Sequence, residues 1–371
     1  MTSRLFSPIR LGGLELASRL VVAPMCQYSA DDGSATPWHL MHLGSLANSG
    51  ASLLIVEATA VERVGRITHG CLGLYSDANE AALVPVLDAC RRYGNAKLGI
   101  QLGHAGRKAS SKRPWEGKTM QDPLDAAQAW PVIGPSAVAM TAHNMPRAMS
   151  LDDLAATRLA FVSAIRRSER LGFDLVELHG AHGYLLHQFL SPLSNKRTDQ
   201  YGGALANRMR YPLEVFAACR EAWPVDKPLG IRVSATDWIE GGLTVDDVIM
   251  FARELKKIDC DFIHVSSGGI DPGAKIAIGP GYQVPHADRI KQESGLPTMA
   301  VGMITDARQA EAILVEGKAD MIAAARAFLD DPHWGWHAAY TLGAEVTLPP
   351  QYRRAGLKAW APAERHAQKR A

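Results

Sequence analysis

The chain has 371 residues, of which 47% are hydrophobic and 21% are charged, and its formal net charge is +2. Such a balanced charge gives no electrostatic reason to expect nucleic acid or a membrane surface as a partner. The five cysteines are scattered, the N-terminus lacks an apolar signal core and no run of 18 apolar residues occurs. We therefore expect reduced thiols and a cytoplasmic location.

The predicted elements are a short hairpin followed by an unbroken alternation of strands and helices. The hairpin falls within residues 5–19, with Gly12 and Gly13 at its turn. The predicted strands are residues 20–23, 53–56, 97–101, 173–178, 229–233, 262–265, 298–301 and 321–324. The predicted helices are residues 39–48, 79–93, 151–171, 205–223, 245–258, 285–293, 307–316 and 332–342.

The repeated strand–helix units predict one TIM-type (β/α)8 barrel domain over residues 1–371, because each parallel strand needs a helical crossover before the next. The alternative is a doubly wound sheet, but no Gly-x-Gly-x-x-Gly follows an early strand. Helix signals agree with the boundaries. Ser150 stands three residues before Asp153, as in a capping box, and Gly172 follows Leu171.

Residues 103–150 form a connection far longer than the roughly two to six residues usual after a strand. We interpret this loop as a capping subdomain over the barrel mouth. Its basic cluster, from Arg107-Lys108 to Lys112-Arg113, is typical of a solvated loop.

In a barrel, the residues just beyond the carboxyl ends of the strands build the functional site. The fourth strand leads into His179-Gly180-Ala181-His182-Gly183-Tyr184. His179 and His182 could present two N–H donors to one acceptor oxygen, and Tyr184 could donate a proton. The spacing also suits half of a zinc site or a purely structural pair, but no acidic or cysteine partner stands at ligand spacing, so no metal is predicted.

The other strand ends are polar and rich in glycine. They contain no carboxylate cluster and no Ser/His/Asp series, so metal-assisted hydrolysis and acyl transfer are poorly supported. The last two strands lead into Gly302 and Arg326, at the place where barrels commonly bind phosphate. A phosphorylated ligand is implied.

Two further side chains narrow the ligand. Gln101 offers both a donor and an acceptor to a planar imide, and Arg232 offers a fixed positive charge to an anionic ring. With the phosphate site, these suit flavin mononucleotide (FMN). Gln101 as an ordinary buried hydrogen-bonding side chain, and Arg232 as an ion-pair partner of Glu57 or Asp237, are the open alternatives.

Five motifs spread over nearly the whole chain carry a resemblance to a known family. They are APMCQY at residues 23–28, HAGRKA at 104–109, HGAHGY at 179–184, LSPLSNKRTDQYGG at 190–203 and AVGMI at 300–304. By these motifs the chain resembles the old yellow enzyme family of FMN-dependent ene-reductases, in the thermophilic-like branch that includes bacterial xenobiotic reductases.

The resemblance implies a set of site residues. Those implied to contact FMN are Pro24, Met25, Cys26, Ala58, Gln101, Arg232, Gly302, Ala325 and Arg326. Those implied to bind the substrate are Tyr28, His179, His182 and Tyr184, with Tyr184 as the proton donor. Cys26 is implied to tune the flavin potential. Ala325 is a departure, since many relatives carry glycine there.

The implied activity is that of an NADPH dehydrogenase or ene-reductase, which uses NADPH or NADH to reduce activated C=C bonds of enones, enals or maleimides. One alternative is the flavin part of a dienoyl-CoA reductase or amine dehydrogenase, which needs clustered iron–sulfur cysteines that this chain lacks. Another is a non-catalytic, flavin-binding redox sensor that uses Cys26.

The tail, residues 343–371, contains Pro350-Gln351-Tyr352-Arg353-Arg354. This segment resembles the tail that reaches a neighbouring subunit's active site in the same branch. It implies a homodimer or homotetramer with Arg354 as the inserted residue, and a solvated tail is the alternative.

Overall fold

The computed structural model describes residues 3–119, 122–140, 145–360 and 363 of the chain. In these residues, parallel strands close into an eight-stranded barrel, so the predicted fold is confirmed. The last strand, β12, pairs with the first barrel strand, β3. The barrel strands are β3 Leu20–Val22, β4 Leu53–Ala60, β5 Lys97–Gly103, β8 Leu175–Gly180, β9 Leu229–Ser234, β10 Phe262–Ser266, β11 Thr298–Ala300 and β12 Met321–Ala324.

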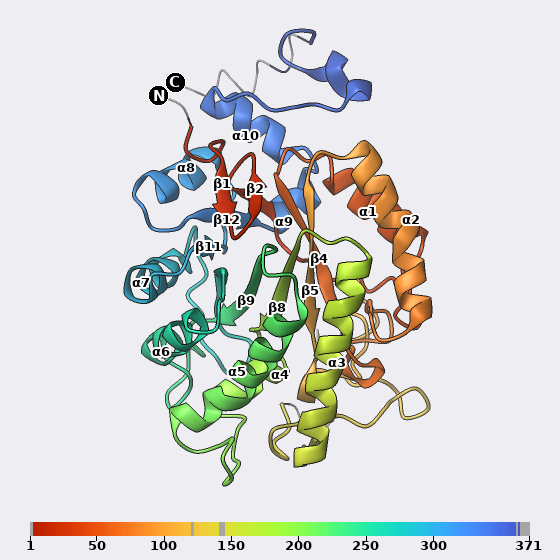
Figure 1. Ribbon diagram of the computed structural model, residues 1–371, viewed down its shortest axis with the longest axis vertical. Helices are drawn as coiled ribbons and strands as arrows, with labels where there is room; N and C mark the ends of the chain where they lie inside the picture. The colour runs from red at the N-terminus through yellow and green to blue at the C-terminus, as the bar shows by residue number, and fades with distance from the viewer. Residues whose placement is uncertain (1–2, 120–121, 141–144, 361–362, 364–371) are drawn as a thin grey trace.

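Helices surround the barrel, with α1 to α3 on one side of the view in Figure 1 and α5 to α8 on the other. The long helices are α1 Pro37–Leu46, α2 Asp77–Tyr93, α3 Leu151–Arg170, α5 Leu205–Ala222, α6 Val245–Lys256, α7 Val284–Ser294, α8 Ala307–Val315 and α10 Trp334–Leu342. The predicted capping box is present, since Ser150 Oγ accepts from Asp153 N and Asp153 accepts from Ser150 N. None of the described helices is long and apolar enough to cross a bilayer.

Two short helices were missed by the sequence prediction, α4 Leu185–Leu190 and α9 Arg326–Asp330. Every residue of α4 is buried. A helix that is buried on all sides shows no alternation of apolar and polar residues, which is the signal that predicts a helix from sequence. α9 has only five residues, which is too short for such a period to appear.

The N-terminal hairpin closes one end of the barrel. Strands β1 Ile9–Leu11 and β2 Leu14–Leu16 pair antiparallel, and Gly12 in the turn has a φ of 51°. Leu11 and Leu16 are each 1% exposed and belong to one apolar cluster with residues of the barrel strands, including Phe262. In Figure 1 the hairpin lies at the end of the barrel away from the long loop.

The long loop between β5 and α3 lies at the opposite end, the mouth of the barrel. The regular elements of its described residues are the 3-10 turn η2 Gly106–Lys108 and the paired strands β6 Ile133–Gly134 and β7 Arg147–Ala148. The ring of Trp115 meets that of Tyr28 edge-on at 5.9 Å, and Trp130 Nε1 donates to the Val64 carbonyl at 2.9 Å. The loop is therefore held against segments that follow β3 and β4.

The prediction that the basic cluster of this loop is solvated is wrong for Arg107 and Lys108, which are only 5% and 8% exposed. The guanidinium of Arg107 donates to the carbonyls of Ile270 and Val138. These backbone acceptors replace water for the buried cation. Charge alone therefore misled the sequence interpretation.

Strand β4 contains an irregularity at the mouth. Its register against β5 shifts between Val56 and Ala58, so that Val56 lies opposite Ile100 and Ala58 lies opposite Gln101. Glu57 is the extra residue of the bulge. Its carboxylate lies 3.4 Å from His39 Nε2 in α1 and accepts a hydrogen bond from Gln27 N.

Candidate active site

The end of β8 and the turn that follows it bring His179, His182 and Tyr184 together at the mouth. The ring centroid of His179 lies 5.2 Å from that of His182 and 4.7 Å from that of Tyr184, and both pairs are nearly perpendicular. His182 and Gly183 have positive φ values of 56° and 74°. A Cβ atom at Gly183 would lie 2.2 Å from the Gly269 carbonyl oxygen, so this tight turn requires glycine.

Side chains from other elements hold the backbone of this turn. His182 N donates to Ser234 Oγ at the end of β9 (2.9 Å), and Gly183 N donates to His187 Nδ1 in α4 (2.8 Å). The Gly183 carbonyl accepts from Gln188 Nε2 at 2.7 Å. A backbone with positive φ at a non-glycine residue is strained, and these bonds favour that conformation. Sequence reasoning missed these residues, because none carries a motif of its own.

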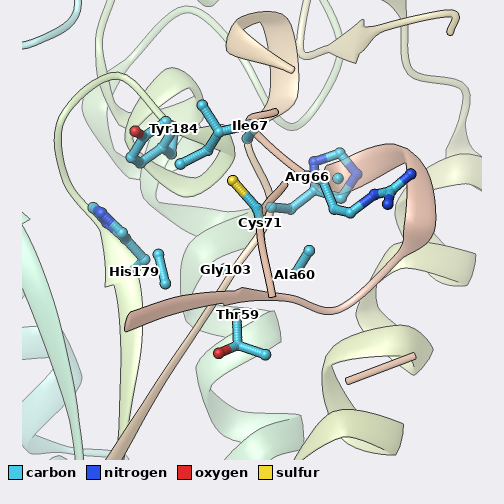
Figure 2. A pocket seen from close by; sticks show the side chains of 12 residues that line it. Thr59, Ala60, Arg66, Ile67, Cys71, Gly103, His179 and Tyr184 are labelled. Carbon is cyan, nitrogen blue, oxygen red and sulfur yellow. The ribbon is translucent and has the colours of Figure 1, made fainter. Parts of the chain in front are cut away.

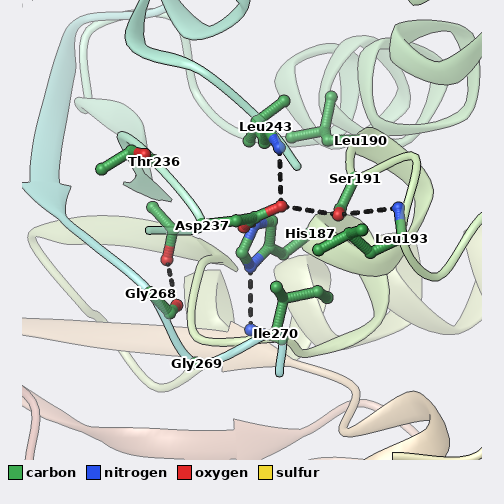
Figure 3. A network of polar contacts seen from close by, with 12 residues as sticks. His187, Leu190, Ser191, Leu193, Thr236, Asp237, Leu243, Gly268, Gly269 and Ile270 are labelled. Atoms are coloured by element: carbon green, nitrogen blue, oxygen red, sulfur yellow. Dashed lines mark hydrogen bonds and ion pairs between the residues drawn. The ribbon is translucent and has the colours of Figure 1, made fainter. Parts of the chain in front are cut away.

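His187 is itself fixed by a buried acid (Figure 3). Its Nε2 lies 2.9 Å from Asp237 Oδ1, and neither side chain is exposed. The other oxygen, Oδ2, accepts from Ser191 Oγ and from Leu243 N, both at 2.7 Å. Burial alone would raise the pKa of Asp237, but the attraction of His187 and these hydrogen bonds outweigh it and lower the pKa. The carboxylate thus orients His187, which orients the turn.

Both histidines of the site are neutral. Burial lowers the pKa of His179 and of His182 well below the ordinary histidine value, and the charge of Arg232 lowers both further. His179 Nδ1 accepts from Ala181 N at 3.2 Å, so its proton resides on Nε2, which can donate. His182 Nε2 lies 2.6 Å from Ser266 Oγ, which leaves Nδ1 as the ring atom open to a ligand.

A first hollow lies beside His179 and Tyr184 (Figure 2). It is lined by Ala58, Thr59, Ala60, Gly65, Arg66, Ile67, Cys71, Gly103, His104, Ala105, His179 and Tyr184. Figure 2 shows the sulfur of Cys71 pointing toward the side where Ile67 and Tyr184 lie. Ile67 and Cys71 were not predicted, because they come from an irregular segment well beyond the end of β4.

A second hollow lies beside His182 and Arg232. It is lined by His182, Arg232, Ser266, Tyr282, Gln283, Ala323, Ala324, Ala325, Arg326, Ala327 and residues 301–305. A Cβ atom at Gly302, where φ is 123°, would lie 2.6 Å from Gln283 Nε2, so the wall of the hollow requires glycine there. Ala325 has a φ of −113°, so its backbone is not in the left-handed region that favours glycine.

Arg232 and Gln101 test whether the site fits an FMN ring. Arg232 is 8% exposed, and among the described residues its Nε has no hydrogen-bond partner. In the described part of the chain, Arg232 forms no ion pair with Glu57 or Asp237, whose carboxylates lie beside His39 and His187 instead, so the alternative that Arg232 pairs with one of them is wrong. A buried guanidinium with a free donor suits an electron-rich ring.

Gln101 keeps part of its hydrogen-bonding capacity. Its Nε2 donates to Glu177 Oε1 at 2.6 Å, and the other oxygen of Glu177 lies 2.8 Å from His264 Nδ1. No other side-chain bond of Gln101 occurs among the described residues, so its carbonyl oxygen and second N–H remain available to an imide. The donors of this site therefore fit FMN.

The segment after β3 carries the remaining predicted residues, Pro24, Met25, Cys26 and Tyr28. Burial raises the pKa of Cys26 well above the ordinary thiol value, and the neighbouring Cys71 and Glu57 raise it further, so Cys26 is a protonated thiol. Tyr28 adopts a positive φ of 53°. Electrostatic coupling of Tyr184 to both Cys26 and Tyr28 indicates that this segment lies near the first hollow.

Two predictions concern groups outside these hollows. Arg354 lies in the 3-10 turn η3 Pro350–Ala355 and is exposed. In the same turn, the ring of Tyr352 lies 5.8 Å from that of His333 and 5.9 Å from that of Trp336. The described residues contain no group of three or more His, Cys, Asp or Glu side chains placed to hold a metal ion.

The family match and the similar proteins agree with the FMN-binding site that the geometry indicates. Residues 4–345 match the model of the NADH:flavin oxidoreductase / NADH oxidase family. A relative from Geobacillus sp. (strain WCH70), named NADPH dehydrogenase, is 42% identical over 95% of this chain and 99% of its own. Morphinone reductase superposes with a TM-score of 0.75 at 27% identity, over 95% of this chain and 93% of that one. An old yellow enzyme homologue from Zymomonas mobilis gives 0.75 at 25% identity, over 93% and 94%.

The barrel, the donor set of its mouth and these likenesses define an FMN-dependent oxidoreductase. The chain belongs to the NADH:flavin oxidoreductase / NADH oxidase family, and it is of the old yellow enzyme type. The resemblance to the old yellow enzyme family that its motifs indicate is thus confirmed.

Proposed function

We propose that this protein is an ene-reductase, which uses NADPH or NADH to reduce the activated C=C bond of an enone, enal or maleimide. The relatives named NADPH dehydrogenase support the nicotinamide donor. The cluster of His179, His182 and Tyr184 carries the proposal. The ring centroids of His182 and Tyr184 lie 5.2 and 4.7 Å from that of His179, so two neutral imidazoles and a phenol are close enough to serve one carbonyl oxygen and its α-carbon.

The cofactor would be held by residues of both hollows. The proposed set is Pro24, Met25, Cys26, Ala58, Gln101, Arg232, Gly302, Ala325 and Arg326. Arg232 and Gln101 would meet the ring, and Gly302, Ala325 and Arg326 would meet the phosphate. When bound, FMN supplies the hydride that the substrate's β-carbon receives.

The substrate carbonyl would accept hydrogen bonds from His179 Nε2 and from His182 Nδ1, which carries the ring proton when His182 Nε2 accepts from the Ser266 hydroxyl. Neutral donors preorganised around an oxygen stabilise the negative charge that develops on it. Tyr184 then gives its phenolic proton to the α-carbon, and the phenolate regains a proton from water. Burial raises the pKa of Tyr184 well above its ordinary value, so the phenol is protonated at working pH.

Tyr28 and, from a neighbouring subunit, Arg354 complete the proposed substrate site, which implies a homodimer or homotetramer. The alternative of a redox sensor is not favoured, because a sensing cysteine needs thiolate character, and the raised pKa of Cys26 keeps it protonated.

The test separates the two half-reactions by anaerobic stopped-flow spectroscopy. In Tyr184→Phe, reduction of the flavin by NADPH should keep the wild-type rate, and reoxidation by 2-cyclohexenone should slow by about 10²–10⁴-fold, the usual contribution of a general acid. The product, cyclohexanone, is measured by gas chromatography. The absence of this product from the wild-type reaction would refute the proposal, and a slower reductive step in Tyr184→Phe would assign Tyr184 to nicotinamide binding instead.

A further inference from the structure

Lys108 is a buried cation that touches the catalytic turn from the side of the long loop. It lies in η2, just after β5, and is 8% exposed. Its Nζ donates to the carbonyl of His182 at 2.8 Å and to that of Gly269 at 3.1 Å. The same Nζ lies 5.1 Å from the ring centroid of Tyr184. One ammonium group therefore contacts both the backbone of the turn and the face of the proposed proton donor.

The two carbonyls that Lys108 joins belong to turns in close contact. A Cβ atom at Gly269 would lie 2.7 Å from the Cα of His182, and Gly269 has a φ of 90°. Carbonyl oxygens carry partial negative charge, so a cation placed between the carbonyls of His182 and Gly269 is stabilised by both. Lys108 thus ties the turn after β8 to the loop after β10.

The charged groups around Lys108 are of one sign. In the part of the chain that the structure describes, Lys108 forms no ion pair with a carboxylate, and the charge acting on it is that of Arg107 on the same 3-10 turn. It faces the neutral His179 and His182 from β8 and the turn that follows, whose pKa values it helps to lower. The loop after β10 presents backbone, and its Asp271 acts on Arg107 rather than on Lys108.

We propose that Lys108 is a positioning residue for proton delivery, whose charged ammonium holds the His182 carbonyl and the ring of Tyr184 in the productive arrangement. The inference rests on the proposed role of Tyr184. A cation over an aromatic face stabilises the ring's position. Once the phenol has given its proton to the α-carbon, the same cation stabilises the phenolate until water restores the O–H. No bond to Lys108 forms or breaks in this step.

The structure gives this arrangement a pH dependence. Burial, with a smaller contribution from Arg107, lowers the pKa of Lys108 to about 7. The ammonium is therefore present below about pH 7 and is lost as the pH rises through that value. The neutral amine keeps two N–H donors for the carbonyls but has no charge to offer the ring. Proton delivery should accordingly weaken above neutral pH.

The experiment compares three variants with the wild type in the flavin-loaded enzyme. Lys108→Met removes the charge at similar length, and Lys108→Arg keeps a cation at every working pH. Lys112→Met is the matched control, because it removes an ammonium of the same loop whose partner is Asp125. Reductive and oxidative half-reactions are followed by stopped flow from pH 6 to about pH 9, with 2-cyclohexenone as the oxidant.

The wild type should lose oxidative rate as the pH rises through about 7. Lys108→Met should be slow at every pH, by about tenfold at pH 6, the effect of a cation–π contact of ordinary strength. Lys108→Arg should be fast at every pH. Flavin reduction by NADPH should be the same in all variants. A Lys108→Met enzyme with the wild-type rate and pH profile would overturn the inference, as would a Lys108→Arg enzyme as slow as Lys108→Met.

Tyr184→Phe, measured in parallel, separates this inference from the proposed function. If Tyr184→Phe is slow and Lys108→Met is not, only the role of Lys108 is wrong. If Tyr184→Phe is as fast as the wild type, the proposed role of Tyr184 fails, and that of Lys108 fails with it.

A stability measurement tests the same buried cation without any turnover. The pKa of Lys108 is about 7 in the folded chain and takes the ordinary lysine value of ~10.4 in the unfolded chain. At pH values between these two pKa values, only the unfolded chain holds the proton on this lysine. The free energy of unfolding should therefore gain a contribution that increases with pH across this window. Lys108→Met should lack that increase and Lys112→Met should retain it. Identical pH profiles for Lys108→Met and the wild type would contradict the buried, titrating ammonium.

Discussion

The two ends of this barrel are held by different forces. At the closed end, Leu11, Leu16 and Phe262 pack into an apolar cluster in which each is at most 1% exposed. At the mouth, His182 and Gly183 are held by side-chain hydrogen bonds from β9, α4 and the long loop. Apolar packing has little directional preference, whereas each hydrogen bond fixes an atom. We infer that the closed end supplies stability and the mouth supplies position.

The largest expected effect comes from creating a cavity at the closed end, which tests whether the two ends of the barrel have separate roles. Phe262→Ala should lower the free energy of unfolding by about 3–5 kcal/mol, the usual cost of removing a buried phenyl group, because the side chain is fully buried. The rate of enone reduction at 25 °C should stay unchanged. Urea denaturation with a parallel activity assay measures both, and Val225→Ala, at a residue that is 88% exposed, is the control with little expected effect. A loss of rate in the folded Phe262→Ala enzyme would show that the two ends are not separable.

The converse change is at the mouth. His179→Ala and His182→Ala should each cost about 2.7–4 kcal/mol of transition-state stabilisation, as the loss of one oxyanion donor does elsewhere. When 4-hydroxybenzaldehyde binds the oxidised wild type as phenolate, we expect a long-wavelength absorption band, and either variant should weaken it. The double variant should cost less than the sum, because both donors serve one oxygen. His286→Ala, on α7, is the control. Retention of the wild-type band and affinity in both single variants would make the pair structural.

The barrel strands and the position of the site could be predicted from the sequence, and what could not be predicted has a physical cause. The apolar runs located all eight barrel strands, and HGAHGY located the end of β8 and the following turn, which bear His179, His182 and Tyr184. Whether these residues and the predicted cofactor contacts act as proposed is still a prediction. Sequence patterns report which residues are apolar and how they are spaced, and these features suffice for strands and motifs.

The supports of the turn could not be predicted. Ser234 lies 52 residues from His182, and Lys108 lies 74 residues from it on the other side. Their hydrogen bonds exist only because the barrel brings strand ends together. Lys108 and Arg107 also carried a misleading signal, since a run of basic residues usually faces water, and only backbone carbonyls at the mouth make their burial tolerable.

A smaller effect distinguishes the two thiols of the mouth. Cys26→Ser should shift the midpoint potential of the flavin by some tens of millivolts while FMN content stays constant. For a two-electron couple, a shift of roughly 30 mV corresponds to about 1.4 kcal/mol. Cys71→Ser, which lines the first hollow, is the matched comparison. Spectroelectrochemical titration measures both potentials. If neither variant shifts, or if both shift equally, Cys26 has no special influence on the flavin.

The smallest effect is expected from the tail, which lies outside both ends of the barrel. Arg354→Ala should raise KM for enones a few-fold if this side chain enters a neighbouring site, since an exposed ionic contact is worth about 0.2–1 kcal/mol. Arg353→Ala, at a neighbour that is also exposed, is the control. Truncation after Leu348 should change the oligomer size seen by light scattering. An unchanged KM and size in the truncated chain would remove the tail from the site.

The bulge in β4 means that the spacing of residues before the mouth is itself under constraint. Side chains alternate between the two faces of a strand, so the extra residue Glu57 resets which of the following ones face inward. It places Ala58 opposite Gln101 and directs the carboxylate of Glu57 to His39. Deleting one residue here would exchange the faces of Ala58, Thr59 and Ala60 in a single step. When segments are exchanged between relatives to make chimaeric enzymes, the number of residues in β4 must therefore be kept even where their identities are free to change.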